Sequence, residues 1–167
     1  MATATAKKTD PVALLKSDHE EVKALFEKFE KAKSDGPKKK AARQALIELK
    51  VHAAIEEEIF YPAFDKELGK GEAHEIYLEA EEEHHVAHML IAELDGMPDE
   101  DETFDAKFTV LAENVKHHIQ EEEKEMLPKA KSLGNDRLME LGEKMMQRKK
   151  ELLAAYKSGQ DPLGRMG

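Results

Sequence analysis

The chain has 167 residues, of which 37 % are charged and only 5 % aromatic, and its formal net charge is −10. This negative charge disfavours nucleic acid and anionic membranes as partners. The sequence has no cysteine, which excludes disulfide bonds, thiolate zinc sites and iron–sulfur clusters. Any bound metal ion must therefore be held by nitrogen and oxygen ligands.

Five helices are predicted in an all-α chain rich in Glu, Lys, Ala, Leu and Met. Residues 1–9 are expected to form a disordered lead-in that is not a secretory signal. The helices are expected from Pro11 to the turn at residues 35–37, and at about residues 38–68, 72–94, 104–127 and 136–157. Pro62 should kink the second helix, because it removes a backbone donor. No uncharged run is long enough to span a membrane, so we expect a soluble, cytoplasmic protein.

The first four helices each carry an apolar stripe at a spacing of three and four residues, as a helical bundle requires. Each stripe is interrupted near its middle by histidine, or by histidine and glutamate. The interrupting residues are His19, His52 with Glu56, His84, and His118 with Glu122. A buried carboxylate without a partner destabilises a fold, whereas opposite a metal ion the same charge contributes to binding. The recurrence in four stripes therefore predicts a metal site inside the bundle.

A second segment, which ends at Pro128, partly repeats the segment from His52 to Pro62 at an offset of 66 residues. The offset pairs His52 with His118 and the glutamate four residues after each. Positions i and i+4 project from one face of a helix, so each histidine and its glutamate point the same way. This partial duplication supports the prediction of a metal site.

Adjacent histidines compete for the inward direction, because neighbouring helical residues differ by about 100°. The stripe selects His84 over its neighbour His85, and His88 lies four residues further on the same edge. In the fourth helix the stripe selects His118 over His117. The remaining histidines, His74, His85 and His117, are expected to lie outside the ligand set.

Four motifs occur in order between residues 10 and 130: Asp18-His19-Glu20, His52-x-x-x-Glu56 followed by Phe60-Tyr61-Pro62, His84-x-x-x-His88, and His118-x-x-x-Glu122. In this combination the sequence resembles the hemerythrin-like family, the HHE cation-binding domain. The resemblance implies an up-down-up-down four-helix bundle at residues 10–130, with an additional C-terminal helix and tail at residues 131–167. It also implies two non-haem iron ions (Fe²⁺/Fe³⁺) with an oxo or hydroxo bridge. The implied metal ligands are His19, His52, Glu56, His84, His88, His118 and Glu122, with the two glutamates bridging the irons.

Three details remain open at this stage. The classical oxygen carriers of the family place an aspartate five residues after the fourth-helix histidine, whereas here Glu122 follows at four and Glu123 at five. Glu122 stays on the apolar stripe and is preferred, but reversible O₂ binding is left open. Tyr61 and Tyr77 are candidates for a ligand or a redox partner, although a core or interface role is preferred.

The last predicted helix carries Arg148, Lys149 and Lys150, which are expected to form a solvated face with no part in the chemistry. This helix is expected either to cover one side of the bundle or to mediate association. We expect a monomer or a weak homodimer.

The resemblance favours a binding protein for O₂ or NO that serves sensing, storage or protection against oxidative and nitrosative stress. The alternatives are an enzyme that decomposes peroxide at the same centre, and iron storage or buffering. A ferritin-like oxidase ranks lower, because it needs Glu-x-x-His on two helices and only the third helix offers it, at Glu81-x-x-His84 and the overlapping Glu82-x-x-His85. A helical interaction module without metal is the remaining alternative.

Overall fold

The computed structural model describes residues 10–164, so the predicted lead-in at residues 1–9 lies outside the described residues. Every regular element in the described range is a helix, which confirms the all-α prediction. The α-helices are α2 (Pro11–Lys31), α3 (Asp35–Ile55), α4 (Tyr61–Leu68), α5 (Glu72–Asp95), α6 (Phe104–Glu121), α7 (Leu127–Ala130) and α8 (Asn135–Lys157). Two π-helical turns, η1 (Glu56–Phe60) and η2 (Glu122–Met126), and a short 3₁₀ turn, η3 (Lys131–Leu133), complete the set. Within the described range, no helix is both long and apolar enough to cross a membrane.

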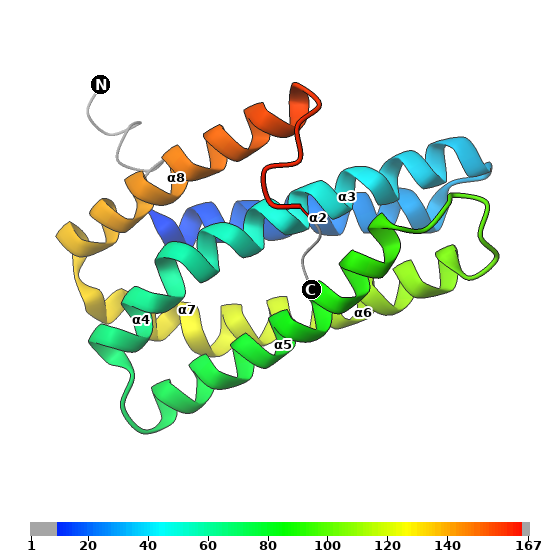
Figure 1. Ribbon diagram of the computed structural model, residues 1–167. Helices are drawn as coiled ribbons and strands as arrows, with labels where there is room; N and C mark the ends of the chain where they lie inside the picture. Colours follow the sequence, from blue (N-terminus) through cyan, green and yellow to red (C-terminus); the bar gives the residue numbers. More distant parts are fainter. Residues whose placement is uncertain (1–9, 165–167) are drawn as a thin grey trace.

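Four long helical segments run side by side as a bundle, and a fifth helix packs against one side of it (Figure 1). The bundle consists of α2, then α3 continued by η1 and α4, then α5, and finally α6 continued by η2 and α7. Short connections join successive segments, so that neighbours in the chain run in opposite directions. Helix α8 lies along α2 and α3 (Figure 1). This arrangement confirms the predicted four-helix bundle with an additional C-terminal helix.

The start of the bundle shows how the sequence specifies its helices. The side chain of Asp10 accepts a hydrogen bond from the backbone N–H of Val12 at 3.0 Å, and Pro11 occupies the first turn of α2. An aspartate cap satisfies a backbone donor that the helix itself leaves unpaired, and proline at the first turn loses no helical hydrogen bond. Helix α2 therefore begins at the residue that the capping pattern predicts.

Two apolar clusters lie on either side of a polar layer. One cluster contains Phe26, Phe108 and Leu111, and the other contains Leu15, Ile55, Phe60 and Met126, among other residues. Between them lie six buried polar residues that we call the central cluster: His19, His52, Glu56, His84, His118 and Glu122. The apolar clusters hold the backbones in place, so the six polar side chains face one another in a site shielded from water.

Each π-helical turn ends two residues before a proline. The backbone N–H of Tyr61 donates to the carbonyl of Glu56, five residues earlier, and the N–H of Leu127 donates to the carbonyl of Glu122 in the same way. Pro62 and Pro128 follow at the next position, where their rings cannot continue the regular ladder. The kink predicted at Pro62 is thus a local widening of the helix. Such single π turns are often found at functional sites.

One charged residue of α8 departs from the predicted solvated face. Arg148 makes an ion pair with Glu58 of η1, with Nε 2.8 Å from Oε2, and this pair is exposed to solvent. Lys149 makes an ion pair with the buried Asp18 of α2, and its side chain is only 14 % exposed. The prediction was wrong for Lys149, because it considered α8 alone and not the acidic residues of the helices against which it packs. Lys150 is exposed, as predicted.

Candidate metal centre

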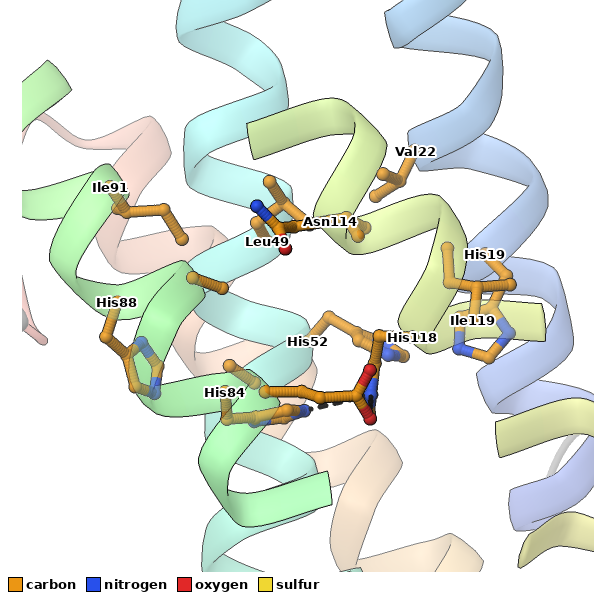
Figure 2. A pocket seen from close by; sticks show the side chains of 14 residues that line it. His19, Val22, Leu49, His52, His84, His88, Ile91, Asn114, His118 and Ile119 are labelled. Carbon is orange, nitrogen blue, oxygen red and sulfur yellow. Dashed lines mark hydrogen bonds and ion pairs between the residues drawn. The ribbon is translucent and has the colours of Figure 1, made fainter. Parts of the chain in front are cut away.

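The central cluster draws one or two side chains from each of the four bundle segments. None of its six members is more than 8 % exposed. Figure 2 shows His19, His52, His84 and His118 around one pocket, each from a different helix. The four histidines for which the helical spacing predicts an inward direction therefore lie together in the fold.

The six residues form two adjacent groups with one shared carboxylate. His19, His52, Glu56 and Glu122 make up one group, and Glu56, His84 and His118 make up the other, with potential ligand atoms within 4.8 Å of one another in each group. Glu56 Oε1 lies 2.9 Å from His52 Nε2 and 3.4 Å from His84 Nε2. The two carboxylate oxygens of Glu122 each lie 3.3 Å from an Nε2 atom, one of His19 and the other of His118. Each glutamate thus stands between a histidine of one group and a histidine of the other.

Several buried polar atoms of the central cluster make no hydrogen bond of good geometry. They are both ring nitrogens of His19, His52 Nε2, both oxygens of Glu56 and Glu122 Oε1, even though His52 Nε2 and Glu56 Oε1 lie only 2.9 Å apart. Folded proteins rarely leave buried polar atoms unpaired, because each one costs desolvation energy. Imidazole and carboxylate are ligands that suit divalent iron and similar transition metals. The unpaired atoms and the type of donor therefore fit a site for metal cations.

The outward-facing nitrogens of the histidines meet carboxylates. Nδ1 of His52 lies 2.9 Å from Asp18, that of His84 lies 3.1 Å from Glu57, and that of His118 lies 3.2 Å from Glu83. Nδ1 of His19 faces Glu123 at 3.7 Å, which is too long for a hydrogen bond. An imidazole that donates its Nδ1–H to a carboxylate keeps the Nε2 lone pair for a metal, and metal-binding histidines commonly have such partners. Sequence reasoning expected acceptors of this kind without identifying them, since acidic residues are abundant on every helix.

His88 and Glu123, two residues considered in the sequence analysis, lie at the edge of the centre. His88 Nε2 lies 2.7 Å and 3.0 Å from the two oxygens of Glu57, and these residues form a third small group with His84. Glu123 is 27 % exposed at its side chain, whereas Glu122 is buried in the central cluster. The structure thus places Glu122 inside, as the stripe predicted, and places His88 against Glu57 instead of within the central cluster.

Tyr61 lies within the centre, although sequence reasoning preferred a core or interface role for it. Its fully buried hydroxyl group donates a hydrogen bond to Glu122 Oε2 at 2.6 Å. The Tyr61 hydroxyl oxygen also lies 3.0 Å from His84 Nε2 and 3.2 Å from His118 Nε2. In a regular α-helix, a residue five positions after Glu56 would point about 140° away from it. The π-helical turn η1 instead directs Tyr61 towards the centre. In the sequence, only Pro62 indicates this irregular turn.

The buried carboxylates and imidazoles strongly perturb one another. Burial alone would lower the pKa of His118, but the carboxylates of Glu122, Glu83 and Glu56 raise this pKa to about 10. Glu56 and Asp18 likewise outweigh burial and raise the pKa of His52 well above its usual value. In the metal-free centre the imidazoles of His52 and His118 therefore hold protons that a cation must displace to bind. Metal affinity should consequently fall as the pH is lowered.

Exposed histidines next to the centre allow a test of the helical register. His85 and His117 are exposed, whereas their neighbours His84 and His118 are in the central cluster. We expect His85→Gln and His117→Gln to retain the metal content of the wild-type protein, and His84→Gln and His118→Gln to reduce it. Elemental analysis of purified, metal-loaded protein gives the content per chain. A large loss in His85→Gln or His117→Gln would mean that the register is shifted by one residue.

Comparisons with known proteins agree with this geometry. The chain has 24 % sequence identity to the crystal structure of a hemerythrin HHE cation binding domain-containing protein, the Rv2633c homolog from Mycobacterium kansasii. The similarity covers 93 % of this chain and 94 % of that chain, with a TM-score of 0.75, and shows a shared fold. No match was found among curated proteins. The model of the hemerythrin HHE cation binding domain family matches residues 10–130, so the chain belongs to this family.

Proposed function

We propose that this protein is a non-haem di-iron protein that binds O₂ or NO at the central cluster. In this proposal His19 and His52 would hold one iron, and His84 and His118 would hold the other. Glu56 and Glu122 could supply a carboxylate oxygen to each iron, since each lies between histidines of both groups. Tyr61 stands beside His84 and His118, and His88 supports the Glu57 carboxylate that holds His84. A pair of Fe²⁺ ions supplies the electron density with which O₂ or NO binds.

A small apolar cavity beside the histidines carries this proposal. Its volume is about 40 Å³, and His19, His52, His84 and His118 line one side of it (Figure 2). Its other lining residues include the aliphatic Val22, Leu49, Ile91, Val115 and Ile119. By the same measure a single water molecule needs about 10–15 Å³, so the cavity has room for a diatomic molecule. Aliphatic walls favour a weakly polar gas and exclude competing water.

Filling the cavity tests whether it serves ligand binding. Ala87 is partly buried and lines the cavity, so Ala87→Leu adds aliphatic volume to it without altering a polar residue of the centre. We expect the iron content to stay unchanged, while O₂ or NO binds at least about tenfold more slowly, equivalent to a barrier increase of about 1.4 kcal/mol. Stopped-flow absorption on the reduced, iron-loaded protein measures the binding rate.

The matched control is Ala106→Leu, because Ala106 is exposed on α6 and does not line the cavity. The Ala106→Leu variant should bind O₂ or NO at the wild-type rate. An unchanged rate in Ala87→Leu, with iron fully loaded, would argue against the cavity as the ligand site.

A peroxide-consuming enzyme is the second candidate, and the Tyr61 phenol favours it. Burial and the nearby Glu122 and Glu56 carboxylates raise the pKa of Tyr61 well above its usual value, so the hydroxyl group keeps its proton. In the conversion of two H₂O₂ into two H₂O and O₂, one peroxide supplies the two electrons and two protons that the other consumes, and a protonated phenol beside the histidines can relay a proton between them. Rapid release of O₂ from added hydrogen peroxide by the iron-loaded protein would select this activity over gas binding.

A further inference from the structure

The carboxylate of Asp18 connects the C-terminal helix to the central cluster. Asp18 lies on α2 and is only 4 % exposed. One of its oxygens lies 2.9 Å from His52 Nδ1, and the other forms the ion pair with Lys149 of α8. On the opposite side of the same imidazole, Nε2 faces Glu56 at 2.9 Å. Lys149, Asp18, His52 and the centre therefore form a continuous chain of contacts.

Asp18 differs from the other carboxylates that meet the histidines. The side chains of Glu57, Glu83 and Glu123 are 31 %, 21 % and 27 % exposed, so water reaches them. The side chain of Asp18 is only 5 % exposed. A buried carboxylate is strongly destabilising unless a cation and hydrogen bonds compensate its charge. Lys149, whose side chain is 14 % exposed, provides this cation from a helix outside the four-helix bundle.

We propose that Lys149 is a positioning residue for the metal centre: it fixes Asp18, and through Asp18 the imidazole of His52, so that α8 determines how tightly the centre holds its metal. This inference rests on the proposed function, because it requires a metal ion at His52. The match to the family model ends at residue 130, so α8 lies outside the segment that carries the family's motifs. The carboxylate partners of ligand histidines set the orientation and basicity of the ring.

The test compares rates of metal release from iron-loaded, full-length variants into an excess of chelator. Changes to the outer partners of metal ligands typically weaken binding by about 10- to 100-fold. We expect Lys149→Met to release the metal about tenfold faster than the wild-type protein, near the lower end of that range. Lys149→Arg, which keeps the charge, should restore most of the wild-type behaviour. The number of metal ions bound at saturation should stay the same in both variants.

Two control variants separate positioning from the general stability of α8. Lys150→Met removes an exposed charge from the adjacent position and should have no effect. Arg148→Met removes one of the other ion pairs that link α8 to the bundle but does not touch Asp18. It should leave the release rate unchanged and lower the melting temperature only slightly, because exposed ion pairs contribute little stability. Equal acceleration by Arg148→Met and Lys149→Met would overturn the inference, as would a wild-type rate in Lys149→Met.

A second pair of variants keeps the test decisive if Lys149→Met does not fold. Asp18→Asn retains an acceptor oxygen for His52 but needs no neighbouring cation. In the Asp18→Asn background, Lys149→Met should change the release rate by less than about twofold, since the two residues act through one contact. A full effect of Lys149→Met in that background would overturn the inference. A wild-type protein that binds no metal would instead overturn the proposed function, and this inference with it.

Discussion

Glu56→Gln is expected to reduce the iron content from two ions per chain to one or none. Glu56 is fully buried and belongs to both groups of the central cluster. Glutamine preserves the volume of the side chain but removes its negative charge and one acceptor oxygen. Both irons would lose a shared anionic ligand, so the effect should exceed that of any single histidine. Elemental analysis after anaerobic loading with Fe²⁺ measures the content.

Glu58→Gln is the matched control for this experiment. Glu58 lies two residues later in the same π-helical turn, is exposed, and pairs with Arg148 instead of a histidine. Its replacement should leave two irons per chain and cost little stability, because exposed ion pairs contribute about 0–1 kcal/mol. Full iron content in Glu56→Gln would exclude Glu56 as a bridging ligand.

Tyr61→Phe is expected to weaken metal binding at the position of His84 and His118 by about 10- to 100-fold, the range found for partners of metal ligands. The substitution removes only the hydroxyl group, which lies 2.6 Å from Glu122 and about 3 Å from both histidines. The phenyl ring remains in the core, so the fold should persist. Competition with a chelator measures the affinity, and the visible spectrum of the ferric protein shows whether the phenol contacts iron.

Tyr77→Phe is the control for Tyr61→Phe, because the Tyr77 ring packs edge-on against Tyr61 with ring centroids 6.5 Å apart, outside the central cluster. It should retain wild-type affinity and spectrum. If Tyr61→Phe behaves in the same way as Tyr77→Phe, the phenol is a packing residue and takes no part in metal binding.

The sequence was sufficient to predict the helical bundle and the inward direction of the side chains that form the central cluster, because both depend on a short-range periodicity. A stripe at a spacing of three and four residues identifies the buried face of a helix without knowledge of its neighbours. His19, His84 and His118 each continue such a stripe, so their inward direction followed from counting residues. His88 shares a face with His84 and lines the same cavity, as the periodicity indicates, but its contact with Glu57 depends on a residue of another helix and could not be predicted.

Features that depend on contacts between distant segments were not predictable. Lys149 meets Asp18 across 131 positions of sequence, and nothing in the composition of α8 distinguishes it from its exposed neighbour Lys150. Tyr61 reaches the centre only because a π-helical turn replaces a regular turn. Proline at position 62 indicates an irregularity but does not specify its form, which depends on how the rest of the helix packs.

The π-helical turn η1 also makes the length of the chain between His52 and Pro62 part of the site. Its extra residue lets side chains before and after the turn face the same point, which a straight helix of that length does not allow. Deleting one residue at the exposed position 58 would make Tyr61 the fourth residue after Glu56, and a regular α-helix places that position within about 40° of the same face. The phenol would then still point towards the central cluster without a π-helical turn. A second deletion has no extra residue to remove, so it would rotate Tyr61 by about 100° away from the centre and should be far more damaging than the first, and the same holds for the matching turn η2.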